Sequence, residues 1–165
     1  MPKETDEVDR IVSAWTRQRP DLDFSPLEVL SRVDRLSRHL DRARRDAFRR
    51  SELEPWEWDV LSALRRAGEP FQLSPKQLLQ QTLVSSGTMT NRIDRLVGRR
   101  FVRREPDPSD GRSVLVTLTD EGKTRVDAAI TRLVDAEAVL LGTLSRSDRD
   151  RLAALLRKLS LGFDS

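Results

Sequence analysis

The chain has 165 residues and a formal net charge of +3, and its 35% charged and 37% apolar residues fit one ordinary domain that is helical and well solvated. It contains no cysteine and only one histidine, His39, which excludes disulfides, thiolate metal sites and thiol sensors, so no metal ion and no cofactor is expected. The sequence has neither an apolar run of about 18 residues nor a signal-like segment, so we expect a cytoplasmic protein with no membrane partner.

Two helices are predicted at the N-terminal end. The first covers residues 5–18. Its apolar residues recur with the spacing of one helix face: Val8, Ile11, Val12 and Trp15. After a proline-bounded linker at 19–25, Ser25-Pro26 is typical of a helix start, and the second helix is expected to end near Arg50. Because about seven turns exceed what a small globule needs, this helix is expected to span a subunit boundary.

A third helix is predicted at residues 56–67, between Glu54-Pro55 and Gly68. Its apolar residues lie on two sides, with Trp58, Leu61 and Leu64 on one side and Trp56, Val60 and Ala63 on the other. A helix that is apolar on two faces is usually sandwiched between layers. Asp59 on this helix is therefore expected to lie close to buried surface.

The next stretch has the pattern of two helices joined by a tight turn. A short strand at 71–73 precedes a helix that Ser74-Pro75 begins, and Thr82-Leu83-Val84 makes the turn into a second helix at 85–99. The core face of this second helix consists of Met89, Ile93 and Leu96. Its outer face carries Gly87, Asn91, Asp94 and Arg95, with Thr88 and Thr90 on the flanks.

Two further features of the 85–99 helix bear on binding. Its leading turn, residues 85–88, is small and polar, so the backbone there can approach phosphate closely. Arg92 lies about 60° from Met89 on the helical wheel, toward the interior. A buried unpaired charge is costly, so Arg92 is expected to have a partner or a ligand.

A basic hairpin follows the second helix. Residues 101–104 and 114–118 have strand composition, and the 105–112 connection contains two prolines and an Asp-Gly pair, which favours an ordered turn with Arg112 near its tip. Between positions 92 and 104 there are six arginines and one acid. Such a patch is typical of a polyanion footprint, although a solvated helix face would have the same composition. Together these elements predict a winged helix-turn-helix, which fits DNA grooves.

Two apolar helices are predicted at the C-terminal end. Thr119 caps the first, and Ser145 or Ser147 begins the second. Their apolar residues are Val126, Ile130, Leu133, Leu140 and Leu144 in the first helix, and Leu152, Leu155, Leu156 and Leu159 in the second. These faces must pack against each other, against the N-terminal helices or against a second subunit. The fold class is thus mainly α with a small β wing, in one structural domain: helices for dimerisation and a pocket at 1–54, a DNA-binding lobe at 55–118, and dimerisation helices at 119–165.

The sequence resembles the MarR (multiple antibiotic resistance regulator) family of bacterial transcription factors over roughly residues 28–160. Asp107-Pro108-Ser109-Asp110-Gly111-Arg112 looks like the Asp-x-Arg wing of that family, and Leu118-Thr119-Asp120-Glu121-Gly122 looks like its Leu-Thr-x-x-Gly helix start. Asn91-Arg92-Ile93-Asp94-Arg95-Leu96 resembles the family's recognition helix. One departure is Arg100, which stands directly before Phe101-Val102 where family members usually have glycine.

The resemblance implies a homodimer on a palindromic operator in double-stranded DNA, with each recognition helix in a major groove and each wing in a minor groove. The DNA-binding residues it implies are Ser86, Thr88, Thr90, Asn91, Arg95, Asp110 and Arg112. Asn91 can read adenine and Arg95 guanine, although either could equally contact phosphate. Arg112 would enter the minor groove, with Asp110 orienting its guanidinium.

A closer resemblance, to urate-responsive and related members of the family, is carried by Trp15, Asp59, Arg92 and Arg104. It implies a ligand-binding pocket in which Trp15 offers a stacking face and Arg92 binds a planar anion or carboxylates. The incoming anion would displace Asp59 toward Arg104 and so couple the pocket to DNA. The alternative interpretation is a core tryptophan and a structural ion pair between Asp59 and an arginine.

The resemblance thus predicts a ligand-responsive transcriptional regulator, a repressor released by a small-molecule effector such as urate or a di- or tricarboxylate. A ligand-independent architectural DNA-binding protein is the alternative. An enzyme is not expected, because the chain has one histidine, no cysteine and no glycine-rich phosphate loop.

Overall fold

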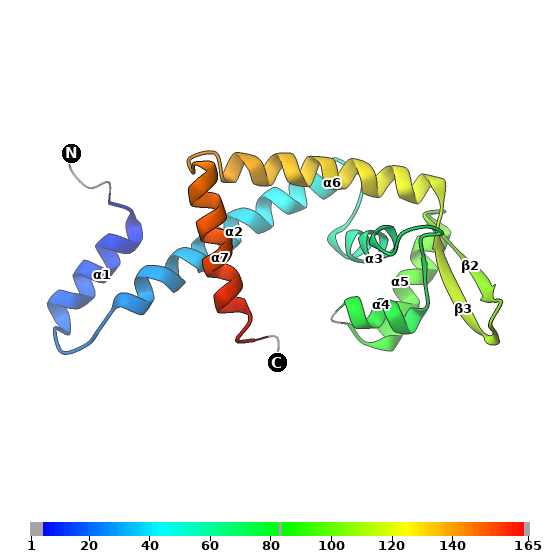
Figure 1. Ribbon diagram of the computed structural model, residues 1–165, viewed down its shortest axis with the longest axis horizontal. Helices are drawn as coiled ribbons and strands as arrows, with labels where there is room; N and C mark the ends of the chain where they lie inside the picture. Colours follow the sequence, from blue (N-terminus) through cyan, green and yellow to red (C-terminus); the bar gives the residue numbers. More distant parts are fainter. Residues whose placement is uncertain (1–4, 83, 164–165) are drawn as a thin grey trace. The chain divides into compact units, whose positions relative to one another are not determined.

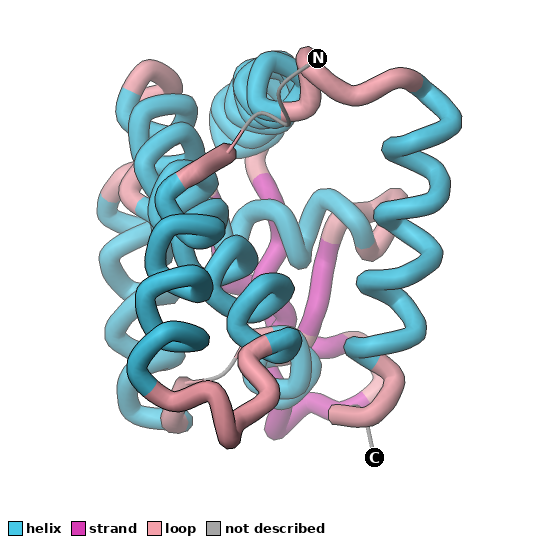
Figure 2. The backbone as a smooth tube through the Cα atoms, turned by 90° about the vertical axis from the view of Figure 1, so that its left-hand side faces the viewer, coloured by secondary structure: helices cyan, strands magenta, loops and turns pink. Residues whose placement is uncertain are grey.

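A computed structural model describes residues 5–82 and 84–163 of the chain (Figure 1). The described residues contain seven helices and three strands. Figure 2 shows the helices in cyan and the three strands in magenta, and the predicted mainly α fold with a β wing is confirmed. The chain divides into two compact units, Met1–Ala43 and Arg44–Ser165, and the boundary falls within the second helix.

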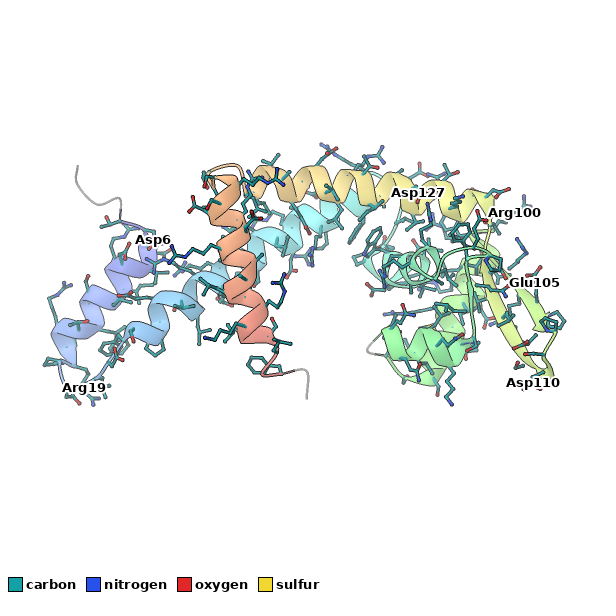
Figure 3. The ribbon with its side chains drawn as sticks, viewed as in Figure 1. Asp6, Arg19, Arg100, Glu105, Asp110 and Asp127 are labelled. Carbon is teal, nitrogen blue, oxygen red and sulfur yellow. The ribbon has the colours of Figure 1, made fainter. Side chains whose placement is uncertain are left out.

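The first unit contains α1 (Glu7–Gln18) and most of α2 (Ser25–Arg49). Asp6, labelled in Figure 3, caps α1, because its carboxylate accepts a hydrogen bond from the Asp9 N–H at 3.0 Å. The same carboxylate accepts from Arg32 of α2 at 2.8 and 3.0 Å, so the cap of one helix is also an ion pair with the next.

The core of the second unit is built around α3 (Pro55–Arg66). Val60, Leu61, Ala63 and Leu64 are fully buried, which confirms that two faces of this helix are covered. Asp59 is half covered, with 53% of its side chain exposed, and burial raises its pKa, in line with the expected position close to buried surface. The buried acid of this helix is Glu57 instead, two residues earlier and only 1% exposed.

The helix-turn-helix consists of α4 (Pro75–Gln81) and α5 (Ser86–Gly98). Ser74 and Ser85 cap the two helices, each accepting a hydrogen bond from the backbone N–H three residues on. The predicted core face of α5 is confirmed, because its members are all buried: Met89, Ile93 and Leu96. Leu83 of the predicted turn lies outside the described residues.

The sheet is antiparallel, with the order β1 (Gln72–Leu73), β3 (Asp110–Leu118), β2 (Val102–Asp107). Its two long strands run further than predicted, and the connection between them is a two-residue turn at 108–109 rather than a loop over 105–112. The Asp107 carboxylate closes the turn by accepting from the Ser109 N–H at 2.8 Å and from the Ser109 hydroxyl at 2.6 Å. Because β2 is an edge strand, Pro106 can lie within it without an N–H to donate.

The end of α5 explains the departure at Arg100. Its φ of 62° is in the left-handed region that glycine usually occupies at this position. The Arg100 N–H donates to the Val97 carbonyl at 2.9 Å, and the Phe101 N–H donates to the Leu96 carbonyl at 3.0 Å. These two bonds form a Schellman motif, so the arginine takes the backbone role of the missing glycine.

The next helix, α6 (Asp120–Leu140), begins directly on this junction. The Thr119 hydroxyl accepts from the Gly122 N–H at 3.1 Å, and the Thr119 N–H donates to the Phe101 carbonyl at 3.0 Å. Gly122 lies so close that a Cβ there would be 2.1 Å from the Phe101 oxygen. The glycine of the Leu-Thr-x-x-Gly pattern is therefore required by close backbone approach.

The last helix, α7 (Arg146–Ser160), has no buried residue. Its large apolar side chains are all exposed in the single chain: Leu152, Leu155, Leu156 and Leu159. Within the described residues, no helix is both long and apolar enough to span a bilayer.

Candidate nucleic-acid interface

The outward face of α5 carries every residue that the sequence analysis assigned to this helix for DNA contact. All five are exposed: Ser86, Thr88, Thr90, Asn91 and Arg95. Two of the hydroxyls have local partners, because Thr90 donates to the Ser86 carbonyl at 3.1 Å and Thr88 lies 2.9 Å from the Ser85 hydroxyl. The side chains of Asn91 and Arg95 make no hydrogen bond to any described residue, so their donors and acceptors are open to a partner.

The basic patch is more neutralised than the sequence suggests. Four of its six arginines lie beside a carboxylate. The pairs are Arg92–Asp59 at 3.9 Å, Arg99–Glu57 at 2.5 Å, Arg103–Glu105 at 2.8 Å and Arg104–Asp94 at 2.6 Å. Arg95 and Arg100 have no such partner among the described residues. The unbalanced positive charge therefore lies on the outer face of α5 and at its C-terminal end.

Arg95 has an aromatic neighbour instead of an acid. Its guanidinium carbon lies 4.6 Å from the ring centroid of Trp56, and that of Arg92 lies 5.9 Å from the same ring. An open groove of about 480 Å³ runs along this side of α5. Its lining residues are Trp56, Gly87, Thr88, Asn91, Arg92 and Arg95.

The tip of the wing carries the two remaining residues predicted to bind DNA. Asp110 is the first residue of β3 and lies at the far end of the hairpin in Figure 3. Its carbonyl accepts from the Ser113 hydroxyl at 3.2 Å. The side chain of Arg112 lies outside the described part of the structure, so its orientation by Asp110 stays a prediction.

The four residues predicted to bind a ligand are distributed over both units. In the second unit, Asp59 and Arg92 are 3.9 Å apart, while Arg104 of β2 pairs with Asp94 of α5 at 2.6 Å. In the first unit, Trp15 is half exposed and stacks on Phe24 with the ring centroids 6.1 Å apart.

The Asp59–Arg92 contact is electrostatically incomplete. The side chain of Arg92 is 19% exposed, and its Nη1 is buried with no hydrogen-bond partner among the described residues. At 3.9 Å the Asp59 carboxylate is too distant for a hydrogen bond. Burial raises the pKa of Asp59, and the positive charges of Arg92 and Arg66 lower it by less. An anion near Arg92 would complete its hydrogen bonding.

The ion pair at the end of α5 is not predicted from the sequence. Arg99 donates through Nη1 to both carboxylate oxygens of the buried Glu57, at 2.7 and 2.5 Å, and through Nη2 to the Glu52 carbonyl at 2.9 Å. Glu57 also accepts from the Glu54 N–H at 2.9 Å. A glutamate three residues into a helix is a local capping signal, which the sequence contained. Its pairing with an arginine 42 residues away has no local signal.

The family follows from comparison with known proteins. A model of the MarR family matches residues 51–113, from just before α3 into β3 of the wing. The transcriptional regulator PecS of Dickeya dadantii is 37% identical over 153 residues, which cover 93% of this chain and 92% of PecS. The chain belongs to the MarR family. The predicted membership of the MarR family is thereby confirmed, whereas the urate-responsive subgroup stays a prediction.

Further MarR relatives agree in sequence and in fold. The transcriptional repressor NicR of Pseudomonas putida is 30% identical over 142 residues, covering 84% of this chain and 88% of NicR. A cysteine-to-serine mutant of MarR from Escherichia coli, solved with operator DNA, is 25% identical with a TM-score of 0.66, covering 94% and 99% of the two chains. These relatives are transcriptional regulators, which confirms that the protein is not an enzyme.

A second solved MarR-type structure concerns regulation by a small molecule. BpsR of Bordetella bronchiseptica, whose DNA binding is regulated by 6-hydroxynicotinic acid, is 29% identical with a TM-score of 0.66. The match covers 87% of this chain and 98% of BpsR. The predicted winged helix-turn-helix is confirmed by the likeness to both solved structures.

Proposed function

We propose that the protein is a cytoplasmic, homodimeric, sequence-specific transcriptional repressor that leaves a palindromic operator when it binds a small anionic or aromatic metabolite. The observation that carries this proposal is the exposed face of α5, where Asn91 and Arg95 present unused hydrogen-bonding groups beside a projecting β-hairpin. The structure of the MarR relative with operator DNA supports the DNA-binding part of this proposal, and the likeness to the repressor NicR supports repression.

The DNA contacts follow from the chemistry of that face. Asn91 can pair with the N6 and N7 edge of adenine, and Arg95 with the O6 and N7 edge of guanine, in a major groove wide enough to admit a helix. Ser86, Thr88 and Thr90 at the first turns of α5 would contact phosphate oxygens. The wing would place Arg112 in the adjacent minor groove, with Asp110 directing its guanidinium.

Dimerisation is supported by apolar side chains that neither unit covers by itself. In the first unit, α2 exposes Val29, Leu30, Val33 and Leu36. In the second unit, α7 exposes four leucines and buries no residue. Burying a leucine side chain contributes roughly 1.5–3 kcal/mol, so a second copy of the chain that covers these faces would be strongly bound. Two copies would then present two recognition helices to two half-sites.

Effector binding is supported by the unpartnered Nη1 of Arg92. A carboxylate or urate oxygen would supply the missing acceptor and would repel the Asp59 carboxylate. The Arg104–Asp94 pair joins the wing to the recognition helix, so a displaced Asp59 that competes for Arg104 would alter their relative placement. BpsR, which responds to an aromatic carboxylic acid, supports this class of ligand.

The experiment that tests the proposal begins with operator selection. Duplexes that the wild-type protein binds from a randomised pool are compared with scrambled duplexes at ~150 mM salt, where phosphate contacts alone give weak binding. Preference for an inverted repeat is expected, and its absence would refute specific regulation.

Release is tested by adding urate, 6-hydroxynicotinate or citrate to the operator complex. At least one should weaken DNA binding by the wild-type protein and should raise its melting temperature by mass action. The Arg92→Ala variant should still bind the operator, but the compound should neither weaken its DNA binding nor raise its melting temperature. A wild-type protein that responds to no compound in a wider anion panel would instead favour the ligand-independent architectural alternative.

A further inference from the structure

We infer that Trp56 is a specificity-determining residue, because its indole ring positions the Arg95 guanidinium for reading a base pair. This inference rests on the proposed function, since it assumes that Arg95 contacts DNA. It concerns a residue outside α5 that would act through Arg95 rather than touch a base itself. The observation behind it is the 4.6 Å distance between the Arg95 guanidinium carbon and the Trp56 ring centroid.

The ring is a fixed surface. Trp56 is the second residue of α3, directly after Pro55, whose ring limits the backbone, and the Glu57 carboxylate accepts from the Glu54 N–H beside it. The side chain is partly buried and packs against the hydrophobic core of the second unit. A guanidinium that lies over this ring therefore loses much of its rotational freedom before any DNA arrives.

The contact with Trp56 leaves the hydrogen-bond donors of Arg95 available. A cation–π contact is an electrostatic attraction to the face of the ring, and the guanidinium has five N–H donors. Among the described residues, the Arg95 side chain makes no hydrogen bond and no ion pair. By contrast, Arg99 and Arg104 are positioned by carboxylates that occupy their donors and balance their charge. Trp56 thus orients Arg95 without neutralising it.

The same geometry explains why specificity, rather than affinity alone, would depend on Trp56. A freely rotating arginine can bind a phosphate at almost any site along a duplex. Bidentate recognition of guanine requires two N–H groups at a defined position and angle. Trp56, Asn91 and Arg95 line one groove, so the ring fixes Arg95 relative to the neighbouring base-reading candidate.

The test is a double-mutant cycle with two probes, the operator selected by the wild-type protein and a scrambled duplex of equal length. Trp56→Leu, which keeps the apolar volume but removes the aromatic face, should lower the ratio of operator to scrambled affinity about 3- to 10-fold. Trp56→Phe should retain most of the ratio. In an Arg95→Ala background, Trp56→Leu should change the ratio no further.

A matched control separates positioning from packing. Trp58 lies on the same helix but stacks on Phe48, with the ring centroids 4.9 Å apart. Trp58→Leu should lower the melting temperature, and any effect of this change on the affinity ratio should be the same with and without Arg95. If Trp56→Leu behaves like Trp58→Leu, or leaves the ratio unchanged, the inference is overturned.

Two further arms keep the test decisive. If Trp56→Leu does not fold, Arg95→Lys tests the same contact at an exposed position, because lysine keeps the charge but has no planar fork. Arg95→Lys should lower the ratio of operator to scrambled affinity, and in that background Trp56→Phe should not change the ratio further. An unchanged ratio in Arg95→Lys would overturn the inference. If the wild-type protein selects no preferred duplex, the proposed function fails, whereas a selected operator without Trp56–Arg95 coupling refutes only the role of Trp56.

Discussion

At the scale of single residues, the charge of the candidate nucleic-acid interface depends on which arginines are already paired with carboxylates. Composition alone counts six positive charges between positions 92 and 104, but acids from α3, α5 and β2 lie beside four of them. The two unpaired arginines occupy different backbone settings. Arg95 lies within α5, and Arg100 lies just beyond its end in a left-handed conformation.

Arg100→Gly should stabilise the fold while weakening DNA binding. A left-handed conformation costs a non-glycine residue about 1 kcal/mol, so glycine should raise the free energy of unfolding by up to about that amount. The lost charge should reduce the dependence of DNA affinity on salt by about one phosphate contact. Chemical denaturation and a salt titration measure the two effects. Arg100→Lys is the control, and a less stable glycine variant would contradict the prediction.

Asp59→Asn should increase affinity for an anionic effector at neutral pH. The carboxylate that repels the ligand is then absent, whereas in the wild-type protein it is lost only when the pH falls through the pKa of Asp59, which burial raises above its ordinary value. Anion affinity of the wild-type protein should therefore rise as the pH falls, and that of Asp59→Asn should lack this rise. Calorimetric titration of each protein with the anion, repeated from pH 7 to 4, distinguishes the wild-type protein from Asp59→Asn. Arg66 and Arg92 are intact in both.

At the scale of secondary structure, each helix start in the second unit is specified locally, and several helix ends depend on distant contacts. Ser74, Ser85 and Thr119 cap the helices that follow them, and each cap was predictable from the sequence. The wing strands are longer than predicted. The stretch between them has the composition of an ordinary polar loop, and the sequence does not show that hydrogen bonds to the Asp107 side chain close it into a two-residue turn.

Long-range pairs account for what the sequence did not predict. Glu57 has the sequence signature of a helix-capping residue, but nothing nearby indicates that it is buried against Arg99. Likewise, Arg104 was assigned to a ligand pocket by resemblance, and its partner Asp94 belongs to a different element. The position of Arg95 over Trp56 also depends on how α3 packs against α5. Tertiary packing decides each of these contacts, so residue pattern alone could not.

Gly122→Ala should destabilise the second unit markedly. The added Cβ would lie 2.1 Å from the Phe101 carbonyl oxygen, and neither backbone segment can move without breaking the Thr119 hydrogen bonds. Overpacking of this kind costs about 1–3 kcal/mol or more. Gly98→Ala is the matched control, because a Cβ at that helical glycine meets nothing within 4 Å and should be neutral or stabilising. Equal unfolding free energies for the two variants would disprove the clash.

The contact between α1 and α2 should be sensitive to acid. Hydrogen bonds from Arg32 and from the Asp9 N–H lower the pKa of Asp6 from 3.8 to about 2. The stabilisation is therefore complete above pH 3.8 and is lost as the pH falls toward 2. Tryptophan fluorescence in a Trp56→Phe, Trp58→Phe background reports on Trp15 and should change across this window. Asp6→Asn should remove the transition, and its persistence there would assign it to another group.

At the scale of the whole molecule, the proposed dimer would have an apolar interface that an introduced charge should break. Leu156→Glu in α7 should convert the dimer to monomer, because a carboxylate would be buried in an apolar contact. Sedimentation velocity measures the change. Val114→Glu in β3, also at an exposed apolar residue but on the wing, should leave the dimer intact. A wild-type protein that sediments as a monomer would refute the interface.

The junction at Phe101 has a consequence for the spacing of the proposed operator. Thr119 donates its N–H to the Phe101 carbonyl at 3.0 Å, and its hydroxyl lies 2.7 Å from the Arg100 carbonyl and 3.0 Å from the Phe101 carbonyl, so α5, the hairpin and α6 are joined at one point. A central spacer lengthened by one base pair would rotate one half-site by roughly a tenth of a turn relative to the other. The joint gives the DNA-binding lobe little freedom to follow that rotation. The geometry of α6 would therefore limit the spacer lengths of the operators that the protein can bind.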